Sequence, residues 1–331
     1  MTDEARRAFL DVRVHHNMHP AEAAMQAERS IGAGSDPTRL LYESPSQARA
    51  WRSLAMSLSP AAKLDDGARA YSEIHSLAAS MIGEDPVQIV GLGCGDGSKE
   101  ADLASRVAPN CPSSTALVDV SLPLIQFAVT NVVNASNSDI DPPVIVDLES
   151  AGSELGQVIE RNGSTRRLIT LYGILPWLGV VRIREVLGSM VGPDDLVCVS
   201  ANLVPGSGEG FSEALSQYDN QPTREWLELL LERLGVRELK SRLRFELVQD
   251  QESGSGRVIV GVIDVEAGTR LNLDDAEIPV EEGRDLQVFK SIRHRPDDLA
   301  DFCDSAGLEL ERLVTSPSGQ EGVALASVRG G

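Results

Sequence analysis

Five short apolar runs lie in the middle of the chain and alternate with helical patterns. Few polar residues interrupt the runs, so they differ from strands that expose one face to water. Helical patterns at 98–107, 122–134 and 181–190 follow the first, second and fourth runs. Strands buried on both faces, with helices between them, predict an α/β fold with a parallel sheet covered on both sides. The runs are 87–90, 114–118, 144–146, 168–172 and 196–200.

The flanking segments have a different pattern. Helical spacing of apolar residues appears at 46–58 and 65–82, before the first run. After residue 206, a helical pattern at 222–234 precedes two period-two runs at 243–248 and 257–265, which predict antiparallel strands. A last helix at 296–305 leads into runs at 308–314 and 322–328. A chain of 331 residues favours two domains, or one large domain with an insertion.

Composition and charge exclude several classes of protein. The hydrophobic content of 42% with 24% charged residues is ordinary for a globular protein. A net charge of −20 disfavours nucleic acid and anionic membranes as partners. The four cysteines form no CxxC pair, so we expect neither a metal site nor a disulfide framework. No apolar signal region or spanning segment of about 20 residues is apparent, and we expect a cytoplasmic location.

A glycine-rich turn follows the first apolar run, at Gly91, Gly93, Gly95 and Gly97. A strand, a glycine turn and a helix N-terminus together favour a bound cofactor, because the backbone can approach the ligand closely. The dinucleotide pattern G-x-G-x-x-G fails from either starting glycine, since its sixth position falls on Asp96 or Ser98. The tighter G-x-G-x-G spacing favours S-adenosylmethionine, although a tight turn in any α/β protein could look similar.

Carboxylates end the next two predicted strands. Asp119 lies 24 residues after Gly95, at the position where an acid accepts hydrogen bonds from an adenosine ribose. Its alternative role is to cap the following helix, but Ser121 can do that. Asp147 ends the third run, where it can accept the adenine amino group while Leu148 packs on the ring. For Asp147, a helix cap or a surface charge is an equal alternative.

The order of several short motifs resembles the histidine-specific methyltransferase family, whose type member makes trimethylhistidine on the way to ergothioneine. The resemblance implies a Rossmann-like class I methyltransferase sheet and a second α+β substrate domain, built from N-terminal helices and a late insertion. The implied segments are 1–80 (N-terminal helices), 81–205 (cofactor-binding core), 206–295 (insertion) and 296–331 (C-terminal helix and strands). The motifs are 41–45, 58–61, 118–121, 171–176, 218–220, 291–293 and 299–307.

The resemblance also implies roles for individual residues. Gly91, Gly93 and Gly95 would line the methionine end of the cofactor, and Lys99 matches a lysine that the family places at the start of the first helix. Asp119 would bind the ribose and Asp147 the adenine. In the family, a tyrosine and a serine at the positions of Tyr218 and Ser291 contact the substrate.

Three positions depart from the family pattern. Gly91 stands where a glutamate is usual, Trp177 replaces an asparagine that holds the amino-acid end of the substrate, and Phe289 replaces a glutamate that reads the imidazole. Losing such polar contacts removes roughly 1–3 kcal/mol of binding. A bulkier or less polar amine than histidine is therefore expected, unless Trp177 and Phe289 are ordinary core residues.

Methyl transfer from a sulfonium needs alignment of donor and acceptor more than a nucleophilic side chain. Tyr218 and Tyr172 are the candidates for positioning the acceptor amine. The leading hypothesis is an S-adenosylmethionine-dependent N-methyltransferase acting on an amino acid or related small amine. A catalytically diverged cofactor-binding regulatory or assembly protein, and a nucleotide-dependent enzyme such as an NAD dehydrogenase, are the alternatives.

Overall fold

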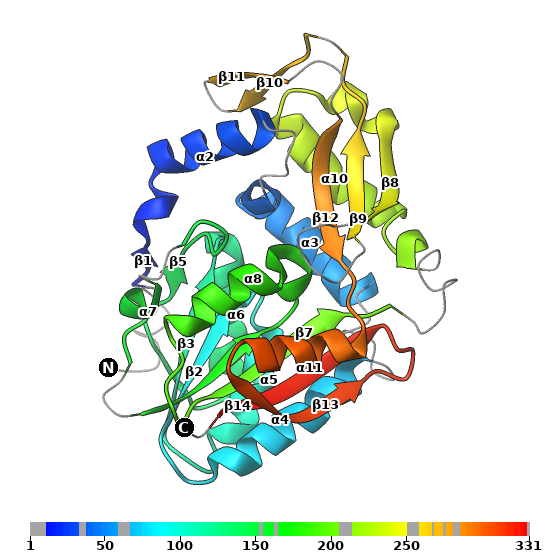
Figure 1. Cartoon of the computed structure of the whole chain (residues 1–331). Coiled ribbons are helices and arrows are strands. Elements are labelled where there is room, and N and C mark those ends of the chain that lie inside the picture. The colour runs from blue at the N-terminus through cyan, green and yellow to red at the C-terminus, as the bar shows by residue number, and fades with distance from the viewer. Residues whose placement is uncertain are drawn as a thin grey trace.

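The computed structural model describes residues 11–32, 38–58, 67–151, 155–161, 165–204, 214–249, 258–266, 268–273, 276–280 and 285–329. The described part of the chain forms two lobes (Figure 1). One lobe is built on a nine-stranded sheet and the other on a three-stranded sheet. Residues 59–61 of the second motif, and the expected boundary between 205 and 206, lie outside the described residues.

Five parallel strands form the centre of the large sheet, in the order β5-β3-β2-β6-β7. In chain order they are β2 (Val87–Leu92), β3 (Ser113–Asp119), β5 (Val144–Ile145), β6 (Arg166–Leu171) and β7 (Leu196–Asn202). Counted along the chain, this is the 3-2-1-4-5 order of a Rossmann-like sheet, whose direction of winding reverses between β2 and β6. Ligands of such sheets bind outside the carboxyl ends of the strands at this point.

Four further strands complete the large sheet. β14 (Glu321–Val328) pairs antiparallel with β7, and β13 (Leu308–Thr315) pairs antiparallel with β14. At the other side, β1 (Arg13–Val14) pairs with β5, and β4 (Asp139–Ile140) pairs with β3. The last two predicted runs therefore extend the central sheet.

Helices cover both faces of the large sheet, which explains the uninterrupted apolar runs. Ile89 and Val90 are neighbours in β2, yet both are fully buried and belong to different cores. One face carries α4 (Gly67–Ile82), α5 (Ser98–Val107) and α6 (Leu122–Ala135). The other carries α7 (Leu155–Val158), α8 (Leu175–Gly188) and α11 (Pro296–Ser305). The expected α/β fold class is confirmed.

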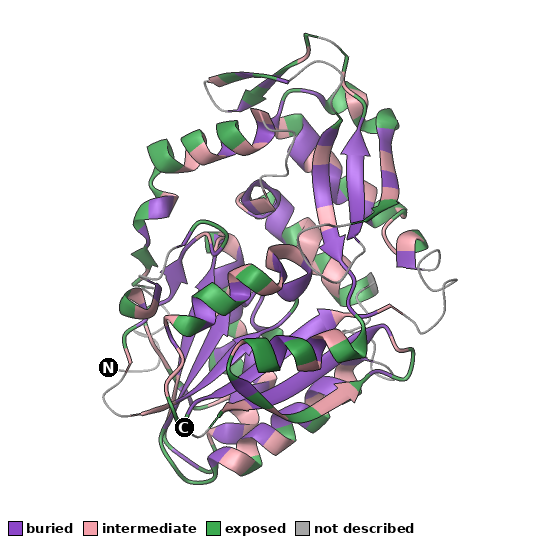
Figure 2. Ribbon diagram, viewed as in Figure 1, coloured by how far each residue is buried: buried purple, intermediate pink, exposed green. Residues whose placement is uncertain are grey.

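The second lobe joins N-terminal helices to the late insertion around one apolar core. The N-terminal part supplies α2 (Pro20–Gly32), the 3-10 helix η2 (Thr38–Leu41) and α3 (Pro45–Leu58). The insertion supplies α10 (Gln221–Arg233), η4 (Arg237–Arg242), β8 (Leu243–Val248), β9 (Val258–Ile263) and β12 (Leu286–Ile292), in the sheet order β12-β9-β8. Figure 2 shows β9 and most of β12 buried and β8 only partly buried, whereas α2 exposes most of its outer face.

Several elements differ from the sequence-based expectations. The sequence pattern did not predict α2, β12 or the hairpin of β10 (Arg270–Leu273) and β11 (Ala276–Pro279). α8 begins at Leu175, six residues earlier than expected. Gly179 interrupts this helix with non-helical φ and ψ angles of 72° and 168°, which separates its first turn from the part that the sequence pattern predicts. α4 lies within the expected N-terminal segment but packs on the large sheet. None of the described helices is long and apolar enough to cross a membrane.

Candidate cofactor and substrate site

A cavity of about 640 Å³ opens at the carboxyl ends of β2, β3 and β6 and extends to the small lobe. This volume lies in the range of small-molecule sites. The large sheet contributes the glycine turn, Asp119, Asp147, Leu148 and Tyr172 to its lining. The small lobe contributes aromatic side chains from α3 and β12. All predicted site residues except Gly91 line this one cavity; the predicted set is Gly93, Gly95, Lys99, Asp119, Asp147, Leu148, Tyr172, Trp177, Tyr218, Phe289 and Ser291.

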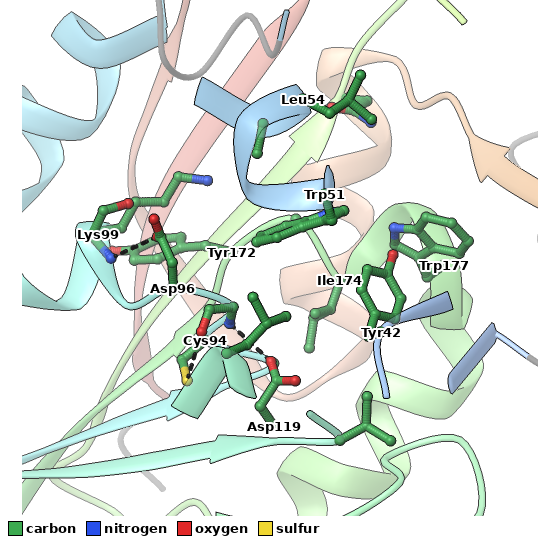
Figure 3. A pocket seen from close by; sticks show the side chains of 18 of the residues that line it. Tyr42, Trp51, Leu54, Cys94, Asp96, Lys99, Asp119, Tyr172, Ile174 and Trp177 are labelled. Atoms are coloured by element: carbon green, nitrogen blue, oxygen red, sulfur yellow. Dashed lines mark hydrogen bonds between the residues drawn. The ribbon is translucent and has the colours of Figure 1, made fainter. Parts of the chain in front are cut away.

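The glycine turn brings its backbone to the surface of the cavity. Gly95 has a φ of +56°, in the left-handed region that favours glycine. A Cβ at Gly95 would lie 2.6 Å from Cη2 of Trp51, so α3 packs directly on the turn. Figure 3 shows Trp51 reaching from α3 toward the turn, with Asp119 at the end of β3 beside it. A ligand on this turn therefore lies between the large sheet and α3.

Asp119 is fixed to the glycine turn by hydrogen bonds. Its Oδ2 accepts from the Gly95 backbone N–H at 2.8 Å, and its Oδ1 accepts from the Ser121 N–H at 2.9 Å. Ser121 caps α6 by accepting from the Leu124 N–H, so the cap is supplied as expected from Ser121. Burial raises the pKa of Asp119 to about 6, although backbone donors oppose the shift. Each oxygen keeps acceptor capacity for a further donor, such as a ribose hydroxyl.

Asp147 and Leu148 line the cavity two strands away from β2. The Asp147 carboxylate accepts from the Glu149 N–H at 2.9 Å and from Ser150 Oγ at 3.0 Å. Asn17 donates to the Asp147 carbonyl oxygen at 2.8 Å, which ties the N-terminal segment to this loop. The local turn thus uses part of the Asp147 carboxylate, while the buried Leu148 offers an apolar surface to the cavity.

Gly91 lies within β2 and does not line the cavity. A Cβ at this position would lie 2.8 Å from Cγ of Glu100, a fully buried residue of α5. The Glu100 carboxylate accepts from Thr170 Oγ1 at 2.8 Å, on the strand next to Gly91. Burial raises the pKa of Glu100 to about 7. Glu100 thus fills the space beside the position where the resembled family has its own glutamate.

Tyr172 belongs to a buried polar chain that ends near the protein surface. Its hydroxyl is 2.8 Å from Nε2 of His75, whose Nδ1 is 2.6 Å from Oδ2 of the half-exposed Asp102. Because a carboxylate only accepts, His75 donates through Nδ1 and accepts from Tyr172 through Nε2. Burial raises the pKa of Tyr172 well above its usual value, so this phenol is a neutral donor. Tyr172 can position groups but is poorly suited to removing protons.

Lys99 reaches the same region from the first turn of α5. Its Nζ lies 4.6 Å from the ring centroid of Tyr71 and 5.9 Å from that of Tyr172. Aromatic faces attract cations at such distances. A cation beside the glycine turn can attract the carboxylate at the methionine end of a cofactor.

Aromatic side chains form the wall of the cavity on the small-lobe side. Trp177 and Phe289 meet edge to face with centroids 5.0 Å apart, and Tyr218 lies 5.1 Å from Phe289. The ring centroid of Tyr42 lies 6.2 Å from that of Trp177 and 5.9 Å from that of Trp51. Figure 3 shows Tyr42 beside Trp177. Trp177 and Phe289 also pack against the apolar core of the small lobe. Each residue therefore contributes both to the core and to the cavity lining.

A polar group ends the aromatic wall. The Tyr218 hydroxyl is 2.9 Å from Ser291 Oγ, and Asn202 Nδ2 lies within 3.5 Å of both oxygens. Arg293 Nη2 donates to the Tyr218 hydroxyl at 2.8 Å. Tyr218 and Ser291, which are 73 residues apart in sequence, therefore lie within hydrogen-bonding distance of each other.

Sequence reasoning missed several residues of the site. Trp51 carried no signal of its own, because only the packing of α3 on Gly95 reveals it. Tyr42 and Arg293 lay inside motifs that carried the resemblance, and that position could have marked them. Asn202, at the end of β7, could have been found by the same strand-end rule that identified Asp119.

No family model and no curated protein sequence matches this chain. Among solved structures, it is similar to magnesium protoporphyrin IX methyltransferase from Synechocystis PCC 6803, with 10% identity, a TM-score of 0.41, and coverage of 86% of this chain and 95% of that one. A SAM dependent methyltransferase from Aquifex aeolicus gives 10% identity, a TM-score of 0.41 and coverage of 86% and 99%. A Rhodobacter sphaeroides protein described as a candidate Zn-dependent alcohol dehydrogenase gives 14% identity and a TM-score of 0.40, with coverage of 86% of this chain and 98% of that one. Likenesses this distant carry no weight for the reaction, so the functional argument rests on the site.

Proposed function

We propose that the protein is an S-adenosylmethionine-dependent N-methyltransferase that acts on an amino acid or related small amine other than histidine. One observation carries the proposal. Asp119 is hydrogen-bonded to the Gly95 backbone at the carboxyl ends of two adjacent parallel strands, and both face a cavity whose other wall is aromatic.

The cofactor assignment follows from the chemistry of the large-sheet half of the cavity. Asp119 presents a carboxylate to a ribose, and Leu148 presents an apolar surface to an adenine ring. Lys99 offers a positive charge to a carboxylate at the methionine end, where the glycine turn allows close approach. The three groups suit the three parts of S-adenosylmethionine in order.

The acceptor assignment follows from the small-lobe half. An amine gains positive charge as it takes the methyl group, and the aromatic rings of Trp177 and Tyr42, which line the cavity, can stabilise such a charge. Tyr218 and Ser291 can orient the acceptor through their hydroxyl groups. An apolar wall formed by Trp177 and Phe289 suits a bulkier side chain than imidazole. The motif order supports kinship with the histidine-specific family, with a diverged acceptor end.

The reaction requires the acceptor nitrogen, the methyl carbon and the sulfur to lie in line. Bound S-adenosylmethionine would supply the methyl group and leave as a neutral thioether, and the methylated nitrogen would release its proton to solvent. Closing the acceptor between two lobes excludes water and fixes this alignment. Tyr218 is the residue that we assign to positioning the amine, and Tyr172 supports the cofactor side.

Calorimetric titration tests the cofactor, and isotope transfer tests the reaction. Binding of S-adenosylmethionine or S-adenosylhomocysteine at micromolar concentration, without binding of NAD, is expected. Transfer of a deuterated methyl group to one member of a panel of amino acids and amines, detected by mass spectrometry, is expected next. Binding of NAD in place of S-adenosylhomocysteine would overturn the proposal.

A diverged cofactor-binding protein without catalysis is the second candidate, favoured by the loss of the family's polar substrate clamp at Trp177 and Phe289. The same assays separate the two functions. Cofactor binding with no methyl transfer to any amine in the panel, at millimolar acceptor, would support the second candidate.

A further inference from the structure

Arg293 is a buried cation on the acceptor side of the cavity. Its exposed fraction is 2%, and it lines the cavity together with Tyr218 and Ser291. Three of its hydrogen bonds go to uncharged oxygens: Nη1 to the Leu203 carbonyl at 3.2 Å, and Nη2 to Gln217 Oε1 at 3.1 Å and to the Tyr218 hydroxyl at 2.8 Å. Its Nε is buried without a hydrogen-bond partner. A guanidinium has five N–H donors, so its donor capacity is not filled.

No ion pair to Arg293 is present among the described residues. Charged side chains are rarely buried unless a partner of opposite charge compensates them. The buried carboxylate of Glu321 interacts electrostatically with Arg293. It also interacts with Lys99 and accepts a hydrogen bond from the Tyr71 hydroxyl. Burial itself raises the pKa of Glu321. Glu321 therefore interacts with two cations and does not form a dedicated ion pair with Arg293.

Acidic side chains are distributed unevenly around the cavity. The acids that line it, Asp96, Asp102, Asp119, Asp147 and Glu149, all belong to the large-sheet lobe. The residues that line the end near Arg293 are neutral apart from Arg293 itself: Asn202, Gln217, Tyr218, Phe289 and Ser291. The hydroxyl groups of Tyr218 and Ser291 and the amide nitrogens of Asn202 and Gln217 can donate hydrogen bonds, while Gln217 Oε1 accepts from Arg293. A positive charge surrounded by donors attracts an anion and disfavours an ammonium ion.

We propose that Arg293, with Tyr218 and Ser291, binds a carboxylate of the acceptor, so that the substrate is a carboxylic acid with a flat apolar body. This inference rests on the proposed function, because it concerns the acceptor end of the same cavity. The aromatic wall of Tyr42, Trp177 and Phe289 contacts the body of the substrate. Among the candidate acceptors, amino acids are then preferred over the amines that remain after decarboxylation.

The proposed carboxylate site also bears on the acceptor nitrogen. An amine must be deprotonated before it can attack the methyl group. The fixed charge of Arg293 favours the neutral form of a nearby amine over the ammonium form, since like charges repel. A single cation can therefore select the acid and favour the reactive state of its amino group.

Matched pairs of ligands test the carboxylate site. Tryptophan and tryptamine, tyrosine and tyramine, and phenylalanine and phenethylamine differ only in whether the carboxylate is present. Titrated calorimetrically with and without S-adenosylhomocysteine, the acids are expected to bind the native protein about tenfold or more tightly than the amines, the range of a charge-assisted hydrogen bond. Equal or tighter binding of the amines, or no binding of any acid at millimolar concentration, would overturn the proposal.

Variants assign the preference to Arg293. Arg293→Gln is expected to remove the preference for acids, because acids should bind more weakly and amines, no longer repelled by the fixed charge, at least as tightly as before. Arg224→Gln is the matched control: Arg224 also lies over an aromatic ring of the small lobe, Phe245, but pairs with Asp219 and does not line the cavity. Its acid preference should equal that of the native protein. An unchanged preference in Arg293→Gln would overturn the assignment.

Arg293→Lys keeps the assignment testable if the glutamine variant does not fold. Lysine retains the charge but loses the planar fork, so acid affinity should fall several-fold without a change in amine affinity. An acid affinity equal to that of the native protein would contradict the role of the guanidinium. Failure of the native protein to bind S-adenosylhomocysteine would refute the proposed cofactor alone, because the preference for acids is also measured without it.

Discussion

At the scale of single residues, the proposed cofactor site depends most on Asp119. Backbone N–H groups of Gly95 and Ser121 each hold one of its oxygens. The same carboxylate is buried, so its ionised form is costly, and its pKa rises to about 6. A ribose that donates two hydrogen bonds would favour the ionised form. In the proposed site, cofactor affinity should therefore depend on the charge of Asp119.

Affinity for S-adenosylhomocysteine should fall at acidic pH. Below a pKa of about 6, Asp119 is protonated in the free protein, and binding must first remove this proton. From about pH 7.5 to about pH 5 the dissociation constant should rise roughly tenfold, as measured by calorimetric titration. Asp119→Asn should bind about 10- to 100-fold more weakly at neutral pH and lose this pH dependence. An unchanged affinity in this variant would refute the ribose assignment.

Residue positions next to strand ends could be predicted from the sequence, whereas contacts between distant elements could not. Lys99 and Asp119 are near in sequence to the apolar runs that place them in the cavity. The loss of a glutamate at Gly91 was visible, but its consequence was not. That Glu100 fills the neighbouring space depends on how α5 packs against β2, which no local pattern encodes.

At the scale of elements, burial on both faces made the strands of the large sheet recognisable. The strand β12 escaped prediction because its register shifts between Gln287 and Phe289, which interrupts the two-residue period. This irregularity lies directly beside Phe289 and near Ser291, so the feature that hid the strand is part of the site. The early start of α8 was hidden in a similar way, because Gly179 divides the helix just after Trp177.

The packing of α3 on the glycine turn can be separated from backbone strain by two substitutions. Gly95→Ala places a Cβ 2.6 Å from Trp51 in a residue with φ of +56°. Gly83→Ala is the matched control, because Gly83 has φ of +67° and open space around its Cβ position. Both variants should lose about 1–2 kcal/mol from left-handed strain, and Gly95→Ala a further 1–3 kcal/mol from overpacking.

Urea unfolding measures both losses of stability. Trp51→Phe removes the indole atoms that the new Cβ would meet, so Gly95→Ala combined with Trp51→Phe should lose less than the sum of the single losses. Strict additivity would show that α3 does not press on the turn in solution.

At the scale of the whole molecule, buried ionisable groups couple stability to pH in two opposing directions. Burial raises the pKa values of Glu100, Asp119 and Glu321, so their contribution to stability declines as pH rises from their unfolded values. Burial lowers the pKa values of His75 and His294, so stability is lost as pH falls below 6.5. The net charge of −20 adds self-repulsion toward alkaline pH. Between these effects, a maximum of stability on the acidic side of neutrality is expected.

Glu100 can be isolated from the other groups by an isosteric change. Its pKa is about 7 in the folded protein against 4.5 as the ordinary value. Its contribution is therefore complete below pH 4.5, is lost progressively up to about pH 7, and stays lost above that. The shift corresponds to about 3 kcal/mol for a fully buried group. Glu100→Gln keeps an acceptor for Thr170 but never ionises, so the loss should be absent in this variant.

The free energy of unfolding of both proteins in urea, at about pH 5 and about pH 8, measures the effect. Between these pH values, the free energy of unfolding of the variant should rise by about 2–3 kcal/mol relative to that of the native protein. Only the native protein has a buried carboxyl group whose ionised form is unfavourable at the higher pH. Glu309→Gln, an exposed change on β13, should gain nothing. If the difference in free energy of unfolding between Glu100→Gln and the native protein is the same at both pH values, Glu100 is ionised in its buried position. A compensating cation must then lie near it, and Lys99, the adjacent residue whose charge lowers the pKa of Glu100, would be the residue to substitute next.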